Sequence, residues 1–225
     1  MYTFFYYFLI FFIYSFIGWC IEMISCSYHT KKIINRGFLI GPYCPIYGIA
    51  SILMTSFLTN YKNDLLVLFI MATFICSILE YITSYLMEKL FKARWWDYSN
   101  KPFNVNGRVC LINSLYFGIL GVLLISVIHP FIINIISSIS NDYFYIITTF
   151  LFTVFLIDYI TSFKITFTLK KSFQNLRKDS TEEISKKIKE TISESSKLFT
   201  RILDAFPNLK PLNKKKKRSF LNFFK

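Results

Sequence analysis

The hydrophobic positions along this chain form five long stretches, which are separated by short polar segments. The stretches cover about residues 3–23, 38–58, 65–87, 109–128 and 143–163. A helix needs about 20 mainly apolar residues to cross the hydrocarbon core of a bilayer. The pattern therefore predicts an all-α fold, a polytopic membrane helix bundle with about five transmembrane helices. A further apolar stretch, residues 131–140, is too short to cross and is typical of an interfacial piece or a turn.

The composition agrees with a membrane protein. Of the 225 residues, 54% are hydrophobic and 20% are aromatic, whereas 17% are charged. Soluble domains carry roughly 25% charged residues. These values exclude a disordered chain and do not fit an ordinary soluble domain.

Lysine and arginine are distributed unevenly between the loops that join the predicted helices. The loops after the first and third stretches are basic, whereas the loop after the second holds only Lys62 and the loop after the fourth holds none. The basic loops contain Lys31, Lys32, Arg36, Lys89, Lys92, Arg94, Lys101 and Arg108. Because short basic loops stay on the cytoplasmic side, we expect a multi-pass protein of the cell membrane with its N-terminus outside and its C-terminus cytoplasmic.

The chain divides into a transmembrane bundle, residues 1–163, and a cytoplasmic basic tail, residues 164–225, which holds 17 of the 26 Lys and Arg. Ser180 and Glu183 match a capping box. The apolar residues that follow recur at helical spacing as far as Pro207, which predicts an amphipathic helix. A polybasic segment comes next and consists of Lys214, Lys215, Lys216, Lys217 and Arg218.

The tail is expected to meet the membrane surface. Adjacent cations favour an anionic leaflet by about 1 kcal/mol each, so membrane lipids with anionic head groups are the expected partners. The same amphipathic pattern suits a partner protein, and the plainest alternative is a solvated basic tail. Charge alone would permit nucleic-acid binding, but no recognition motif accompanies it, so we expect no nucleic acid.

Three carboxylates, Glu22, Glu80 and Asp158, fall inside predicted spans. Ionisable residues are costly there and are functional candidates by default. Glu80 belongs to a polar stripe on one helical face, which comprises Thr73, Ser77, Glu80, Ser84 and Glu88. For Glu22 and Glu80 the functional interpretation is a substrate or ion site, and the structural one is a buried ion pair with an arginine. For Asp158, near the predicted interface, hydration is expected to suffice.

Small and polar residues follow one face of two other spans. The stripe in the first span comprises Ser15, Gly18, Glu22 and Ser25. The stripe in the fourth span comprises Cys110, Ser114, Gly118 and Gly121, and it predicts close contact between helices. We expect the three stripes to pack around a common polar interior.

The first basic loop is unusual because three Gly and two Pro fall within residues 37–48. This composition prevents a regular helix, and irregular backbone at membrane depth requires cover from protein or water. A helix that starts near Ile46 would offer free N–H groups to an anion, and Arg36 would add the matching charge. We therefore group Asn35 and Arg36 with the polar interior, although a simple tight turn explains the same residues.

The second basic loop combines charged and aromatic residues: Arg94, Trp95, Trp96, Asp97, Tyr98 and Arg108. Two adjacent Trp residues also suit the membrane interface without further function. Asp97, Arg94 and Arg108 are expected to form a salt-bridged platform beneath the bundle. Asn106-Gly107 predicts a turn before the fourth span. This loop is our candidate for docking a partner protein.

Motifs of several enzyme classes are absent from the sequence. It has no G-x-x-x-x-G-K-[ST], so the chain does not itself carry a P-loop ATPase, and it has no H-E-x-x-H or G-x-S-x-G. His29 and His129 are predicted near opposite faces of the membrane, and the five cysteines show no C-x-x-C spacing. We therefore expect no metal site and no cofactor, and the question of enzyme activity stays open.

The motifs of these loops resemble those of a bacterial family called Putative ABC-transporter type IV, whose members are named ABC transporter permeases. The matching motifs are Gly18-Trp19 with Glu22, Asn35-Arg36-Gly37-Phe38-Leu39 with Gly41-Pro42, Pro45-Ile46-Tyr47-Gly48, Glu80, Trp95-Trp96-Asp97-Tyr98-Ser99, and Phe103-Asn104 with Gly107-Arg108 and Cys110-Leu111. They lie within about residues 10–130, and Ala50 stands where the family pattern has a glycine. The resemblance implies the permease half of an ATP-driven transporter and implies no substrate.

Two hypotheses of function follow. The first is a permease subunit that depends on a separate ATPase, with the polar interior near Glu22 and Glu80 as its substrate path. The alternative is a membrane-embedded enzyme or binder that acts on an anionic lipid or a lipid-linked phosphate, where carboxylates near arginines do acid–base work. A third class, a non-enzymatic scaffold whose tail organises partners, requires the tail rather than Glu80.

Overall fold

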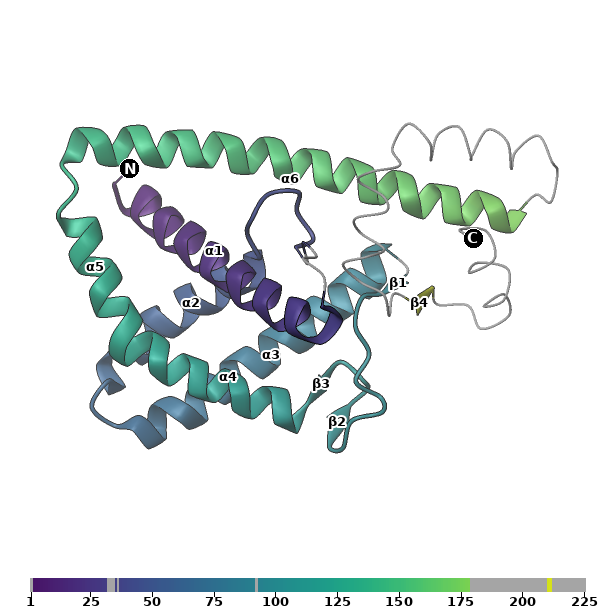
Figure 1. Ribbon diagram of the computed structural model, residues 1–225, viewed down its shortest axis with the longest axis horizontal. Helices are drawn as coiled ribbons and strands as arrows, with labels where there is room; N and C mark the ends of the chain where they lie inside the picture. Colours follow the sequence, from purple (N-terminus) through teal and green to yellow (C-terminus); the bar gives the residue numbers. More distant parts are fainter. Residues whose placement is uncertain (1, 32–34, 36, 92, 179–209, 212–225) are drawn as a thin grey trace.

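The computed structural model describes residues 2–31, 35, 37–91, 93–178 and 210–211 (Figure 1). The α-helices are α1 (Tyr2–Thr30), α2 (Pro45–Leu58), α3 (Leu65–Phe91), α4 (Leu111–Leu123), α5 (His129–Ser137) and α6 (Asn141–Lys178). A 3₁₀ turn, Thr59–Tyr61, follows α2, and a π-helical turn, Leu124–Ile128, joins α4 to α5. Two short antiparallel pairs complete the fold, β1 (Ala93–Arg94) with β4 (Lys210–Pro211) and β2 (Asn104–Val105) with β3 (Val109–Cys110).

Among the described residues, four helical segments are long and apolar enough to cross a membrane. They are Tyr2–Tyr28, Leu65–Phe91, Leu111–Ser137 and Asn141–Phe167. This confirms the all-α membrane bundle. The last helix continues across residue 163, where we placed the start of the tail, and ends at Lys178.

The fourth span is longer than the sequence pattern predicts. Residues 131–137 belong to α5 and extend the helical segment that begins at Leu111, so they are not a separate interfacial piece. Pro130 removes one backbone donor and would crowd the preceding helical turn. The wider π-helical turn lies directly before it, and such turns absorb this irregularity without ending the helix.

The second predicted helix starts later than expected. The predicted start at residue 38 is wrong, because α2 begins at Pro45 and has 14 residues. That length corresponds to about 21 Å, less than the roughly 30 Å of a hydrocarbon core. Two prolines explain the difference, since the residue before a proline is disfavoured in the helical region. Residues 37–44 are therefore irregular and lead into the bundle.

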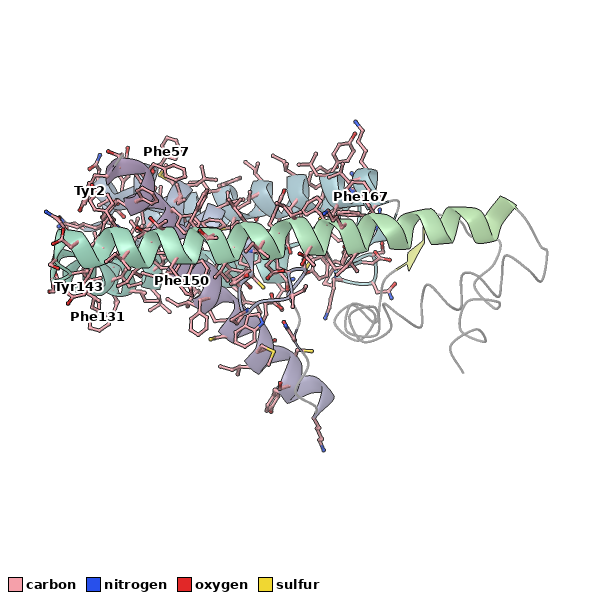
Figure 2. All side chains as sticks on the ribbon, turned by 90° about the horizontal axis from the view of Figure 1, so that it is seen from above. Tyr2, Phe57, Phe131, Tyr143, Phe150 and Phe167 are labelled. Atoms are coloured by element: carbon pink, nitrogen blue, oxygen red, sulfur yellow. The ribbon has the colours of Figure 1, made fainter. Side chains whose placement is uncertain are left out.

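The core of the bundle consists of two apolar clusters. One joins α2, α3 and the π-helical turn around Leu58, Leu68 and Ile125, and the other joins α1, α5 and α6 around Ile10 and Phe144. Many apolar side chains outside these clusters are exposed and point away from the helices, as Phe57, Phe131 and Phe150 do in Figure 2. This outward apolar surface suits contact with lipid.

The small-residue stripe of α4 packs against α3 as predicted. A Cβ atom at Gly118 would collide with Thr73 Oγ1, and one at Gly121 would collide with the Ala72 side chain. Ser114 lies on the same face, and its hydroxyl accepts a hydrogen bond of 2.7 Å from Ser77 Oγ. The two stripes therefore face each other.

Alternate connections lie at opposite ends of the bundle (Figure 1). The N-terminal residues, the α2–α3 connection and the α5–α6 connection lie at one end, and Tyr2 packs against Phe144 there. The β2–β3 hairpin lies at the other end, where Phe38 packs against Phe91 and Phe163. We call this second end the hairpin end.

Replacing Gly118 by Val should destabilise the bundle, because the new methyl groups have no space against Thr73 and Phe69. Overpacking of this kind lowers the free energy of unfolding by about 1–3 kcal/mol, which thermal unfolding in mild detergent measures. Ile119→Val on the exposed face of the same helix is the matched control. Equal unfolding temperatures for the two variants would show that the α3–α4 contact is loose.

Candidate functional site

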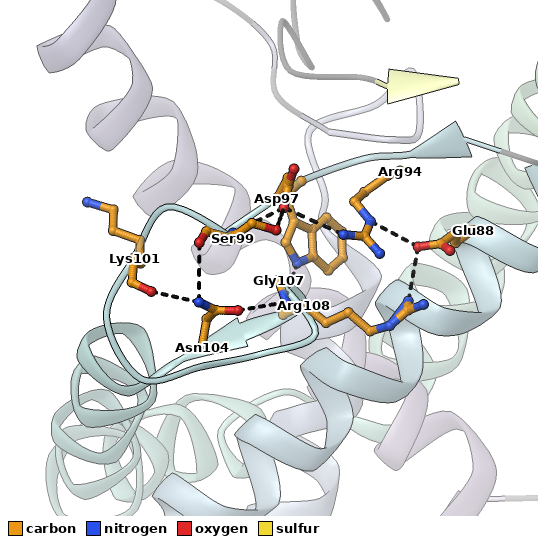
Figure 3. A network of polar contacts seen from close by, with 9 residues as sticks. Glu88, Arg94, Asp97, Ser99, Lys101, Asn104, Gly107 and Arg108 are labelled. Carbon is orange, nitrogen blue, oxygen red and sulfur yellow. Dashed lines mark hydrogen bonds and ion pairs between the residues drawn. The ribbon is translucent and has the colours of Figure 1, made fainter. Parts of the chain in front are cut away.

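The loop between α3 and α4 is held by an ion cluster centred on Glu88 (Figure 3). Glu88 Oε2 lies 3.1 Å from Arg94 Nε and 3.1 Å from Arg108 Nη1. Arg94 Nη1 also lies 3.5 Å from Asp97 Oδ1. The expected platform of Arg94, Asp97 and Arg108 therefore forms, and it needs Glu88, the last residue of the α3 polar stripe, as its common anion.

The β2–β3 hairpin at the end of this loop closes through a tight turn, and it pairs Val105 with Val109. Asn106 and Gly107 both have positive φ, 54° and 66°, and the Arg108 amide donates to Val105 O at 3.0 Å. Two consecutive positive φ values at Asn-Gly are typical of a type I′ turn, which confirms the predicted turn. A side chain at Gly107 would collide with Ser99 and Asp97, so the turn also allows the loop to close.

The aromatic residues of the loop bind it to the helices. Trp96 Nε1 donates to Arg108 O at 3.0 Å, and the Arg108 guanidinium lies over the Tyr81 and Tyr85 rings at 5.6 and 5.4 Å. Trp95 is buried against Phe38 and Phe91. Trp95 therefore packs inside the protein, whereas a membrane-interface belt would leave its ring against lipid.

Glu22 and Glu80 each accept a hydrogen bond from a tyrosine. Tyr47 donates to Glu22 Oε1 at 2.8 Å, and Tyr98 donates to Glu80 Oε1 at 3.2 Å. Burial raises the pKa of the Tyr98 phenol, and the nearby Glu80 and Glu22 carboxylates raise it further, so the phenol stays a proton donor. We call these four residues the interior cluster.

Asp158 has a different environment from the one we expected. Its carboxylate accepts hydrogen bonds from the Ile40 and Gly41 amides at 3.0 and 2.7 Å. It also accepts from the hydroxyls of Tyr43 and Ser162 at 2.6 and 2.8 Å. The expectation that hydration suffices is wrong, because protein donors from the irregular segment surround both oxygens.

The Asn35 side chain makes hydrogen bonds at the start of the same irregular segment. Its Oδ1 accepts from Trp19 Nε1 at 2.8 Å and from the Gly37 amide at 3.1 Å. Its Nδ2 donates to Ile40 O at 3.1 Å. The Asn35 side chain therefore shapes the backbone that enters the bundle.

Some candidate residues lie outside the described part of the chain. They are Arg36 and the polybasic segment Lys214, Lys215, Lys216, Lys217 and Arg218. The predicted amphipathic helix before that segment also lies outside it. Within the described ranges, no group of three or more His, Cys, Asp or Glu side chains is placed to hold a metal ion.

The comparison with known families agrees with this architecture. The model of the family described as Putative ABC-transporter type IV matches residues 9–163. The chain belongs to this family. The match to Putative ABC-transporter type IV contains the interior cluster, the hairpin and Asp158. No curated protein and no solved structure matches the chain.

Sequence reasoning missed the roles of Tyr47 and Tyr43, and it did not single out Glu88 as the centre of the platform. Glu88 carried a usable signal, since it continues the polar stripe of Glu80 and Ser84 toward two arginines. The pattern of polar and apolar residues did not distinguish these two among the 15 tyrosines of the chain, and Tyr47 stood only within a motif of the family resemblance. Tertiary packing alone pairs them with carboxylates.

Asp158→Asn should loosen residues 40–44, because the amide nitrogen of Asn replaces an acceptor and faces existing donors. Each charged hydrogen bond lost costs about 1.5–3 kcal/mol. We expect faster maleimide labelling of the buried Cys44 thiol in a variant that retains Cys44 as its single cysteine. Asp142→Asn at an exposed position is the matched control, and an unchanged labelling rate for Asp158→Asn would refute the anchoring role.

Proposed function

We propose that this protein is a permease subunit of an ABC transporter in the cell membrane and that it depends on a separate ATPase. Membership of the family supports a transporter component, and this sequence has no P-loop of its own. The observation that carries the docking part of the proposal is the braced hairpin: Phe103 is 80% exposed beside a turn that Asn104, Asp97 and Glu88 hold in place.

The hairpin has the properties of a docking site. An exposed aromatic side chain on a rigid support contributes strongly to binding, because little conformational freedom is lost when it enters a partner's pocket. Val105 is exposed beside it, and Lys101 adds a positive charge. Asn104 fixes the tip internally, since its side chain donates to Lys101 O at 2.8 Å and accepts from the Gly107 amide at 3.0 Å.

The orientation of the chain is part of the proposal. Arg94, Arg108 and Lys101 lie at the hairpin end, whereas Lys62 lies in the α2–α3 connection at the opposite end. The positive-inside rule then puts the hairpin in the cytoplasm, where an ATPase is available. The C-terminal tail lies on the same side in this proposal, with Lys214–Arg218 against anionic lipid head groups.

The alternative function, an enzyme or binder of anionic lipid or lipid-linked phosphate, requires arginines whose charge is available to a phosphate. Arg94 and Arg108 are instead paired with Glu88, at 3.1 Å each, and Arg94 is also paired with Asp97 at 3.5 Å. The arrangement therefore favours a structural role for these two arginines and, with it, the permease.

Orientation is testable with single cysteines at exposed positions. Lys62→Cys should react with a membrane-impermeant maleimide on intact cells, and Lys101→Cys should react only after the cells are permeabilised. Labelling of both variants in permeabilised cells is the control for accessibility. The reverse pattern on intact cells would invert the proposed topology.

The docking role of the hairpin is testable by co-purification. A P-loop ATPase should co-purify with the wild-type protein in mild detergent and be identified by mass spectrometry. Phe103→Ser should lose most of this ATPase without a change in the thermal unfolding of the subunit, because the Phe103 side chain is outside the core. Tyr61→Ser, an exposed aromatic in the opposite connection, should retain it.

Two results would contradict this proposal. Absence of an ATPase from the wild-type preparation would argue against ATPase dependence. Full retention of the ATPase by Phe103→Ser would argue against docking at the hairpin while leaving the transporter role intact.

A further inference from the structure

Two carboxylates inside the membrane spans, Asp158 and Glu80, differ in the number of hydrogen bonds that they accept. Both oxygens of Asp158 are used, with two backbone amides and two hydroxyls as donors. Glu80 receives one hydrogen bond, from Tyr98 to Oε1. Its Oε2 atom is buried and has no hydrogen-bond partner among the described residues. Protein donors therefore compensate a negative charge on Asp158, whereas a negative charge on Glu80 is largely uncompensated.

The position of Glu80 makes this difference matter. It lies near the middle of α3, in a segment long and apolar enough to cross the membrane, and it is 5% exposed. An isolated ionised carboxylate in such a site is strongly unfavourable unless a positive charge or hydrogen-bond donors compensate it. The ion pairs found among the described residues involve Glu88 and Asp97, not Glu80. Among the described residues no basic side chain pairs with Glu80, which leaves a proton or a bound cation as its compensation within this part of the chain.

The surroundings of Glu80 are rich in oxygen atoms and in aromatic rings. The Glu22 carboxylate and the Tyr98 phenol both interact electrostatically with Glu80. Tyr47 donates a hydrogen bond to Glu22 and interacts electrostatically with Tyr98. These residues come from α1, α2, α3 and the loop before the hairpin, so four segments meet here. Among the described residues, the other titratable groups that interact with this cluster are Cys44, Cys76 and Cys110.

We propose that the interior cluster binds a monovalent cation, with Glu80 Oε2 as its principal ligand atom. A single positive charge is the complement of one uncompensated carboxylate oxygen, and phenol oxygens and ring faces favour both alkali ions and ammonium groups. Tyr98 is a positioning residue, because its hydrogen bond occupies Oε1 and leaves Oε2 as the oxygen without a partner. The inference rests on the proposed transport function, because the bound cation would be either the transported substrate or an ion whose movement is coupled to transport.

Carbodiimide labelling tests the site in the wild-type protein, without any variant. Dicyclohexylcarbodiimide enters apolar regions and forms a stable adduct with a carboxyl group that carries a proton and lacks strong partners. Purified full-length protein in a buffer of N-methylglucamine should be labelled at Glu80, and Asp158 should stay unlabelled because four donors hold its carboxylate ionised. Mass spectrometry of the peptides locates each adduct.

Protection by cations then identifies the ligand. Sodium, potassium and methylammonium chloride are added separately, so that an alkali ion and an ammonium group are distinguished. A bound cation at about ten times its dissociation constant leaves about one site in eleven free, so labelling of Glu80 should slow about elevenfold. Tyr98→Phe should weaken this protection while Glu80 still reacts, and Tyr61→Phe should leave protection unchanged.

Two outcomes overturn the proposal. If Glu80 is labelled and none of the three cations slows the labelling, Glu80 is a protonated carboxyl group that binds no cation. Absence of labelling at Glu80 would show a closed structural side chain. No ATPase takes part in this experiment, so its failure is separate from a failure of ATPase co-purification, and a cation site would survive even if no ATPase were found.

Discussion

The structure depends on one constraint: polar groups at membrane depth must find partners inside the protein. The Asp158 carboxylate is the clearest case, because it binds the Ile40 and Gly41 amides and the Tyr43 hydroxyl from the middle of a spanning helix. These bonds cover backbone groups that no regular helix satisfies. The irregular segment can then enter the bundle, and α2 can be short without exposing unpaired amides to lipid. Asn35 contributes from the other side of the same segment, so that the segment is held between α1 and α6.

Charge compensation organises the hairpin end as well, where two arginines, Arg94 and Arg108, meet one glutamate. Glu88 extends from the last turns of α3 and binds both arginines that flank the loop. With the Asn106-Gly107 turn, this closes residues 94–108 into a rigid unit that presents Phe103 outward. The platform therefore joins the bundle to a surface suited for a partner.

Glu80 differs from Asp158 and Glu88 because it receives a single hydrogen bond, from Tyr98, and its Oε2 atom has no partner among the described residues. Glu80 and Asp158 are both carboxylates within apolar predicted spans. Asp158 is held by protein donors, whereas Glu80 Oε2 is buried and has no hydrogen-bond partner among the described residues. In the proposed transport function, an oxygen that the protein has not compensated offers a cation a place to bind.

The sequence by itself determined the membrane class, four of the spans, the Asn-Gly turn and the helix face that carries Glu80 and Glu88. These features follow from apolar length, local turn chemistry and helical periodicity, all of which act over a few neighbouring residues. Only the tertiary structure decided the late start of α2, the continuation of the fourth span past Pro130, and the partners of each carboxylate. Asp158 meets Ile40 across more than 100 residues, and no local pattern encodes such a contact. The roles of Glu80 and Asp158 therefore differ through their donors, which come from distant segments that folding brings together.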